Sequence, residues 1–401
     1  MMDNGYFQKI EDEFLAGTYQ KIPVLAARAQ GANIWDLEGK EYLDLMSGYG
    51  VAILGHSDEK IKAAIMQQME KVYITHASVY SPARAAFLKD FMSIAPGGLN
   101  RAFLSNSGTE AVEAAIKIAV KSTKRHRMIS MERGYHGKTL GSLSVTHSSK
   151  YRKSFHDILV GDVEFVKFGD AEMLRKALSS FDVAAVFVEP VQGEGGINLP
   201  GDQYFKEVRE MTEASGTLLI MDEIQSGLGR TGKMWAHEHW GITPDIMTVG
   251  KGIGGGIPMG VTVGKSEFVD ALEIGEQSST TGGNPLACAA GSAVIDRLRS
   301  GYVEKARDTG KYFLERMQED LGNHRLVSHA RGIGMMLALE LRIRFLPVLM
   351  NLLDRGVITL YSGINIIRML PPYILTREQV DEAILEIKGA LDDQLKQGGA
   401  V

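Results

Sequence analysis

The sequence predicts an α/β fold, with a mostly parallel sheet flanked by helices in a large domain and a smaller α+β domain beside it. The chain has 401 residues, 44% of them apolar, so it can bury a large core and form two or three domains. Between about Arg101 and Val263, short apolar runs alternate with helical apolar spacing, which is typical of parallel sheets. Beyond Asn284 the pattern changes to long helices.

Six short apolar runs are the expected strands of the sheet. They cover residues 101–105, 127–131, 183–188, 217–221, 245–249 and 260–263. Helical apolar spacing between these runs is clearest at 111–121 and 202–214. We expect these helices to flank the sheet.

The two ends of the chain are expected to form the smaller domain together. Near the N-terminus, Glu38-Gly39-Lys40 is typical of a hairpin turn between two short strands. The C-terminal part has two short strands before its last helix, and its helical patterns lie at 286–298, 303–321 and 377–395. We therefore expect a large domain of residues 46–284 and a small domain built from residues 1–45 and 285–401.

Composition excludes several classes of protein. A net charge of −5 gives no electrostatic reason to expect nucleic acid or an anionic membrane as a partner. The single cysteine, Cys288, excludes an internal disulfide and a multi-cysteine metal site, and its apolar neighbours predict a buried thiol. The sequence has no long uncharged apolar span, and its polar, acidic start is unlike a signal peptide. We therefore expect a soluble cytoplasmic protein.

Lys251 and Asp222 are the first residues expected to carry chemistry. Lys251 stands where the apolar run 245–249 gives way to glycines, and Asp222 directly follows the run 217–221. Open α/β sheets bind ligands at the carboxyl ends of their strands. A lysine among apolar neighbours can lose its proton and attack a carbonyl, and a carboxylate can keep a pyridine nitrogen protonated. The pair therefore suggests a pyridoxal phosphate enzyme.

Ser107, Gly108 and Thr109 lead from the expected strand 101–105 into a helix. At such a turn, free backbone N–H groups and the positive end of the helix dipole favour an anion. These residues are therefore candidates to hold a phosphate. The alternative is that Ser107 or Thr109 is an ordinary N-cap of the helix.

A glycine-flanked loop brings together Tyr135, His136 and Lys138. Tyr135 can stack on a planar ring, and Lys138 can attract a substrate carboxylate as a point charge. His136 was weighed as a metal ligand, but no second histidine lies at ligand spacing. We therefore expect no metal site.

Two carboxylates and an arginine are further candidates. Glu189 and Glu194 lie in a glycine-rich loop after the run 183–188, where the backbone can approach a ligand closely. Arg368 ends a short strand and can either clamp a carboxylate through a bidentate pair or meet a surface acid. A pair of carboxylates is also typical of glycosidases, but an ion pair with an arginine elsewhere in the chain is a better explanation for one of the two. A polar loop, residues 277–285, adds hydroxyl groups that can bind phosphate.

These segments, in this order, resemble the class III (ω-amino) aminotransferases, a branch of the fold-type I pyridoxal phosphate enzymes. The resemblance covers nearly the whole chain, from Trp35 to Pro372, and its most specific stretch is 222–233, followed by Lys251 29 residues after Asp222. The resemblance implies a seven-stranded, mostly parallel sheet. Within this family, the chain resembles the group of enzymes that act on acetylornithine, ornithine, putrescine or 4-aminobutyrate.

The resemblance implies a role toward the cofactor for several residues. Lys251 resembles the Schiff-base lysine, which also moves a proton, and Asp222 resembles the partner of the pyridine nitrogen. The other matching positions are Ser107, Gly108 and Thr109 at the phosphate, Tyr135 stacked on the ring, Gln225 near the ring hydroxyl, and Thr280, which reaches the phosphate of the neighbouring subunit. The last match implies an obligate homodimer with shared active sites.

The resemblance also implies how two substrates share one pocket. Arg368 resembles the residue that binds the α-carboxylate of glutamate or 2-oxoglutarate. Glu194 resembles the acid that pairs with this arginine while an ω-amine donor occupies the site. The remaining residues expected at the substrate are Lys138 and Ser279.

Three positions depart from the usual pattern of these enzymes. Lys138 stands where many relatives have an arginine, and a lysine loses the bidentate geometry. Thr281 and Gln277 replace a usual aromatic and a usual histidine, so that wall of the pocket would be roomier or more polar. Diamine-using relatives often have a lysine at the position of Lys138. The C-terminal part, at residues 341–361 and 368–372, instead resembles acetylornithine aminotransferase and its lysine-biosynthesis counterpart.

The main interpretation is an aminotransferase of amino-acid metabolism that moves an ω-amino group from an N-acylated diamino acid to 2-oxoglutarate. The alternative keeps the chemistry but uses putrescine, 4-aminobutyrate or ornithine. A second alternative is an amino-acid racemase or aminomutase of the same fold. Glu194 with Arg368 argues against it, because an enzyme with one substrate needs no exchange between two.

Overall fold

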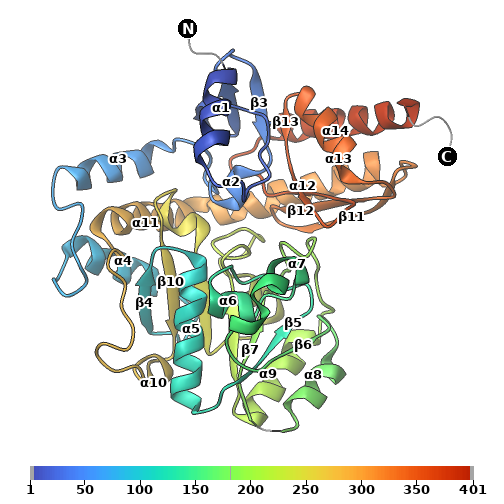
Figure 1. The fold of residues 1–401 in the computed structure, drawn as a ribbon. Helices are drawn as coiled ribbons and strands as arrows, with labels where there is room; N and C mark the ends of the chain where they lie inside the picture. Colours follow the sequence, from blue (N-terminus) through green and yellow to red (C-terminus); the bar gives the residue numbers. More distant parts are fainter. Residues whose placement is uncertain (1–3, 181, 398–401) are drawn as a thin grey trace.

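Three sheets organise the chain, which a computed structural model describes over residues 4–180 and 182–397 (Figure 1). Within these residues, the largest sheet has seven strands and each of the other two has four. Figure 1 shows the large sheet and its helices in the lower half of the molecule, with the N-terminal (blue) and C-terminal (orange to red) segments in the upper half.

The large sheet is mostly parallel. Across it the strands follow in the order β4 (Arg101–Ser105), β10 (Gly260–Gly264), β9 (Ile246–Val249), β8 (Leu218–Asp222), β7 (Val183–Val188), β5 (Arg127–Met131) and β6 (Val163–Val166). β10 runs antiparallel to both of its neighbours, and the remaining pairs are parallel. The predicted fold class is therefore confirmed, with all six expected strands present.

Helices cover both faces of this sheet, so its central strands are apolar throughout. Every residue of β7 is buried. Ala185 and Phe187 pack with the helix that follows β4, whereas Val186 and Val188 pack on the opposite face, with the helices that follow β6 and β7. Strands buried on both faces lose the polar alternation of a half-exposed strand, as observed here.

Helices make up most of the remaining structure. The α-helices are α1 (Asn4–Phe14), α2 (Ser47–Gly50), α3 (Glu59–Met69), α4 (Pro82–Met92), α5 (Gly108–Thr123), α6 (Leu140–Ser144), α7 (Ser149–Arg152), α8 (Ala171–Leu178), α9 (Tyr204–Ser215), α10 (Ser266–Val269), α11 (Pro285–Arg297), α12 (Val303–Leu321), α13 (Phe345–Asp354) and α14 (Arg377–Gln397). Shorter turns are η1 (Lys153–Ile158), η2 (Ala236–Trp240), η3 (Lys251–Gly254) and the π-type η4 (Leu298–Tyr302). None of the described helices has both the length and the apolar character that a membrane span requires.

The two smaller sheets come from the ends of the chain. The first contains β1 (Ala26–Gln30), β2 (Asn33–Asp36), β3 (Glu41–Asp44) and β13 (Val357–Ile358), with β13 parallel to β3. The second contains β11 (Val327–Ile333), β12 (Met336–Leu341), β15 (Ile366–Met369) and β14 (Leu360–Ser362), all antiparallel. The expected hairpin at Glu38-Gly39-Lys40 joins β2 to β3. The N-terminal strands therefore share a sheet with a strand from the C-terminal part.

Two expectations about the strands need correction. Two short strands were expected before the last helix, but the described residues contain five, together with α13. β13 and β14 have two and three residues, too few to show a period-two pattern, and β11 is mostly polar because much of it is only partly buried. β6, an edge strand of four residues, also escaped the sequence pattern.

The single cysteine lies in the core. Cys288 is fully buried in α11, as its neighbours predicted, and burial raises the pKa of its thiol to about 12. It therefore packs as a small apolar side chain.

Candidate active site

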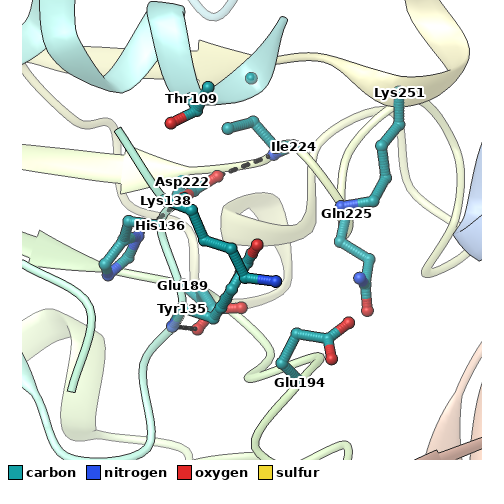
Figure 2. A pocket seen from close by; sticks show the side chains of 12 residues that line it. Thr109, Tyr135, His136, Lys138, Glu189, Glu194, Asp222, Ile224, Gln225 and Lys251 are labelled. Carbon is teal, nitrogen blue, oxygen red and sulfur yellow. Dashed lines mark hydrogen bonds and ion pairs between the residues drawn. The ribbon is translucent and has the colours of Figure 1, made fainter. Parts of the chain in front are cut away.

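A cavity of about 280 Å³ lies at the carboxyl ends of β7, β8 and β9 (Figure 2). The residues that line it are Gly108, Thr109, Tyr135, His136, Gly137, Lys138, Glu189, Glu194, Asp222, Ile224, Gln225 and Lys251. Eight of the twelve predicted site residues belong to this lining. Arg368 contacts the lining through Glu194, whereas Ser107, Ser279 and Thr280 lie outside it.

Asp222 ends β8 and is held in place by two hydrogen bonds. The Nδ1 of His136 donates to Asp222 Oδ2 at 2.7 Å, and the backbone N–H of Ile224 donates to Oδ1 at 3.0 Å. Burial opposes a charge on the His136 ring, but the hydrogen bond to Asp222 outweighs this and raises the pKa of His136. His136 therefore orients this carboxylate in the cavity.

Lys251 follows β9, the strand next to β8, so the two predicted residues line the same cavity. Its backbone has a φ of +49°, which is uncommon for a residue with a side chain. Burial is the main influence on the amine and lowers the pKa of Lys251, while the surrounding carboxylates act in the opposite direction. The site thus favours the neutral, nucleophilic amine.

The N-terminus of α5 forms one wall of the cavity. Gly108 and Thr109 lie at its first two positions, where backbone N–H groups have no partner within the helix. A Cβ on Gly108 would lie 2.8 Å from Ile224 Cδ1, so the close packing requires glycine there. Ser107 is the N-cap: its hydroxyl accepts from the N–H of Glu110. Ser107 is thus the N-cap that the alternative described, and its role at the phosphate stays a prediction; the free N–H groups of α5 are the candidate anion site.

Tyr135 and Lys138 lie on the wall formed by the 134–138 loop. The Tyr135 ring packs edge-on against Tyr151, with 6.0 Å between ring centroids, and burial raises the pKa of Tyr135 to about 12. Lys138 is exposed, and its Nζ lies 4.7 Å from the centroid of the Tyr151 ring. The Tyr151 ring thus packs against the half-buried Tyr135 ring and lies near a cation that can meet a ligand at the cavity rim.

Glu189 is buried at the base of the cavity. It accepts hydrogen bonds from the backbone N–H groups of Tyr135 (3.0 Å) and Gly193 (3.2 Å). Burial raises the pKa of Glu189 to about 7, so near neutral pH it is only partly ionised. Its contacts place it beneath the loop that carries Tyr135.

Glu194, on the loop after β7, and Arg368, in β15, form an ion pair in which the arginine is fully buried and the carboxylate is partly exposed. Arg368 lies in β15 with no exposed surface, and its Nη2 is 2.6 Å from Glu194 Oε1. Burial favours the neutral acid, but the guanidinium outweighs it and lowers the pKa of Glu194. The Nε and Nη1 of Arg368 have no partner among the described residues. These two donors, together with Nη2 once Glu194 moves away, can serve the carboxylate of a ligand.

Ser279 and Thr280 lie on the loop between α10 and α11. The Ser279 hydroxyl accepts from Asn106 Nδ2 and from the N–H of Gly282, both at 3.0 Å. Thr281 donates to Asn106 Oδ1 at 2.8 Å, and Thr280 is exposed. The loop therefore packs against the turn before α5, and neither predicted residue reaches this chain's own cavity.

Sequence reasoning missed two features of the site. His136 was weighed only as a metal ligand, although its ring is the hydrogen-bond partner of Asp222. Tyr49 was not considered; burial, followed by the nearby charge of Glu194, raises the pKa of its hydroxyl, and its backbone has a φ of +60°. The run Ser47-Gly48-Tyr49-Gly50, with glycine at alternate positions, was a signal for this turn.

Comparisons with known proteins agree with the geometry. A family model described as aminotransferase class-III matches residues 14–391. The LysW-aminoadipate semialdehyde transaminase of Deinococcus radiodurans is 40% identical over 386 residues, which cover 96% of this chain and 89% of the relative. The acetylornithine aminotransferase of Methanopyrus kandleri is 38% identical over 96% of this chain and 98% of its own.

A solved structure shows the same architecture. The ornithine aminotransferase from Toxoplasma gondii ME49 superimposes with a TM-score of 0.95 at 29% identity, over 99% of this chain and 97% of its own. The resemblance drawn from the motifs is confirmed by these matches. The chain belongs to the class-III aminotransferases.

Proposed function

We propose that this enzyme is a pyridoxal phosphate-dependent transaminase that moves the ω-amino group of an N-acylated diamino acid to 2-oxoglutarate. The products are a semialdehyde and glutamate. The observation that carries this proposal is the Arg368 guanidinium. Its Nη2 binds Glu194, while its Nε and Nη1 have no partner among the described residues.

This arrangement suits two substrates of different charge. When 2-oxoglutarate enters and Glu194 moves away, Nη2 and the open Nε, which form one edge of the guanidinium, can bind its α-carboxylate in a charge-assisted pair. When an ω-amine donor enters, its reacting end carries no carboxylate, and Glu194 neutralises Arg368 instead. A buried charge thus keeps a partner in both half-reactions, which avoids the cost of an unpaired ion.

The residues present fit pyridoxal phosphate. The first N–H groups of α5 would hold the phosphate, and Tyr135 would stack on the ring. Asp222, already oriented by His136, would accept from the pyridine N–H, and the partnerless Oε1 of Gln225 lines the same cavity. When bound, the cofactor supplies a ring that withdraws electrons from the substrate carbon. Lys251 would hold the cofactor and move a proton at its Nζ, which its lowered pKa favours.

The donor assignment rests on the relatives, and the position of Lys138 is compatible with it. Relatives 38–40% identical to this chain have names that specify acetylornithine or LysW-aminoadipate semialdehyde as substrates. Such donors retain an α-carboxylate far from the reacting amine, and Lys138 presents a cation at the cavity rim. Ornithine, putrescine and 4-aminobutyrate keep the same chemistry and are the alternatives that the first experiment separates.

Loaded with pyridoxal phosphate, the enzyme should lose the visible absorbance of the cofactor fastest with N-acetylornithine. Ornithine, putrescine and 4-aminobutyrate, each tested alone, should react more slowly. Ornithine and putrescine bring a second ammonium group toward Lys138, and 4-aminobutyrate lacks the acylamino group of N-acetylornithine. A faster reaction with any of these three would replace the proposed donor. Interconversion of amino-acid enantiomers without 2-oxoglutarate would favour the racemase instead.

Borohydride reduction should fix the cofactor to the peptide containing Lys251, and Lys251→Ala should abolish this label.

Arg368→Ala should raise the KM for 2-oxoglutarate by about 10²-fold or more, since truncating a buried charged pair costs about 2–5 kcal/mol. The KM for the amine donor should change much less, because the donor does not use Arg368. Glu194→Ala should shift donor preference toward glutamate, because Arg368 then stays open to an α-carboxylate. Steady-state kinetics on both substrates check these outcomes, and equal losses on both would refute the carboxylate role.

In cofactor-free protein, Lys251→Met should raise the thermal-unfolding midpoint by a few degrees at pH 7. The folded state lowers the pKa of Lys251, so burying the ammonium destabilises it fully below that folded-state pKa. The gain should shrink as pH rises toward the ordinary lysine value of 10.5, where the unfolded lysine also loses its proton. Lys206→Met, on the exposed face of α9, is the control and should show no such trend. A gain independent of pH would contradict the pKa argument.

The homodimer with shared active sites is supported by an exposed apolar surface. We call it the 66–80 patch; its large apolar side chains are Met66, Met69, Val72, Tyr73, Ile74, Val79 and Tyr80. Patches of this kind mark contact sites on proteins. Arg84 ties the patch to the loop that carries Thr280, because it donates to the carbonyls of Val79 and Gly283. A second copy on this patch would bring Thr280 near a neighbouring cavity. The cytoplasmic location remains a prediction from composition.

The purified enzyme should have at least twice the mass of the chain by light scattering. Tyr80→Glu should shift it toward the monomer and weaken cofactor binding, because a charge then enters the apolar contact. Ile364→Glu, at an exposed apolar position in the turn between β14 and β15, should change neither property. A monomeric wild-type enzyme that binds the cofactor normally would rule out the shared site.

A further inference from the structure

The loop Gln192–Asn198, which carries Glu194, has a backbone conformation that its own residues disfavour. Gln192 and Asn198 pair at its base. Between them, Gly196 has a φ of +111° and Ile197 a φ of +57°. Ile197 is β-branched and fully buried, and the left-handed region costs such a residue about 1–2 kcal/mol. Contacts from outside the loop must therefore stabilise this shape.

Arg331, on β11, supplies the main contacts. Its Nε donates to the carbonyls of Gly196 (3.1 Å) and Ile197 (3.2 Å), and its Nη2 donates to Gly196 at 2.8 Å. Its Nη1 forms an ion pair with Glu340 at 2.6 Å, which neutralises the guanidinium and fixes its direction. One side chain thus satisfies the two carbonyls at the strained point of the loop.

A second anchor comes from the same sheet. The Ser362 hydroxyl, in β14, donates to the carbonyl of Glu194 at 2.5 Å. A Cβ on Gly196 would lie 2.7 Å from Ile366 Cδ1, so the loop lies directly against β15. β11, β14 and β15 belong to one sheet, and β15 also carries Arg368. The sheet that presents Arg368 therefore also fixes the loop that presents Glu194.

We infer that Arg331 is a positioning residue that sets the Glu194 carboxylate against Arg368, and so biases the choice between an ω-amine donor and a 2-oxo acid. The inference rests on the proposed function. Arg331 does not line the cavity, and it acts only through the main chain of the loop. Without it, relaxation of Ile197 toward an ordinary backbone conformation would withdraw Glu194, and Arg368 would stay open.

A double-mutant cycle tests this role. The measured quantity is the ratio of kcat/KM for N-acetylornithine to kcat/KM for glutamate. Arg331→Met should lower this ratio by roughly 5- to 30-fold, within the range expected for residues coupled through a backbone shift. In a Glu194→Ala background, Arg331→Met should lower the ratio no further, because its effect passes through Glu194. A second, independent decrease in the double variant would overturn the inference.

Two further variants separate positioning from general damage. Arg331→Lys keeps the charge but loses the planar fork, so it should fall between the wild type and Arg331→Met while folding normally. Arg342→Met removes an exposed arginine after β12 and should leave the ratio unchanged. A ratio in Arg331→Lys equal to that of the wild type would show that the loop contacts are not needed.

Hydrogen exchange gives a readout that does not depend on the reaction. In Arg331→Met, the amides of residues 192–198 should exchange faster, while those of β7 stay protected; Arg342→Met should match the wild type. Unchanged exchange in the loop would overturn the positioning role even if activity fell. If the wild-type enzyme were inactive on N-acetylornithine, the proposed donor would be wrong, but the hydrogen-exchange test of Arg331 would still be valid.

Discussion

The ion pair between Arg368 and Glu194 is the contact on which both the shape and the charge of the cavity depend. It joins a loop of the large sheet to a strand of the C-terminal sheet, two parts of the chain 174 residues apart. Removing one partner of such a pair leaves a buried charge uncompensated and costs about 3–5 kcal/mol. The same cost explains why the pair can serve exchange, since an incoming carboxylate is the natural substitute for Glu194.

The remaining chemistry follows from neighbouring parallel strands that end at one edge. β8 and β9 place Asp222 and Lys251 on the same cavity without any long-range adjustment. Burial then divides the charges, because it lowers the pKa of Lys251 and raises that of Glu189 to about 7, while Arg368 holds Glu194 ionised. Lys251 and Ile197 have left-handed backbone conformations, which are strained for residues with a side chain, so the surrounding structure must stabilise this geometry.

Much of the fold could be predicted because its signals are local. All six expected strands of the large sheet are present, since apolar runs between helices report burial on both faces. Strands of two or three residues, such as β13 and β14, leave no periodic signal, and the pairing partner of β13, the strand β3, lies far away in the sequence. The parallel pairing of β3 with β13 is a contact of this kind, decided by the packed structure alone.

For the site, the sequence by itself determined the chemical types and their order: the lysine and aspartate after adjacent strands, the small residues before α5, and a carboxylate-arginine pair. These are encoded locally, in a few residues beside a strand end. Only the tertiary structure decided that His136 orients Asp222, that Ser107 caps a helix, and that Arg331 fixes the Glu194 loop. Each of these depends on the direction of a side chain and on partners brought close by packing, which sequence spacing does not record.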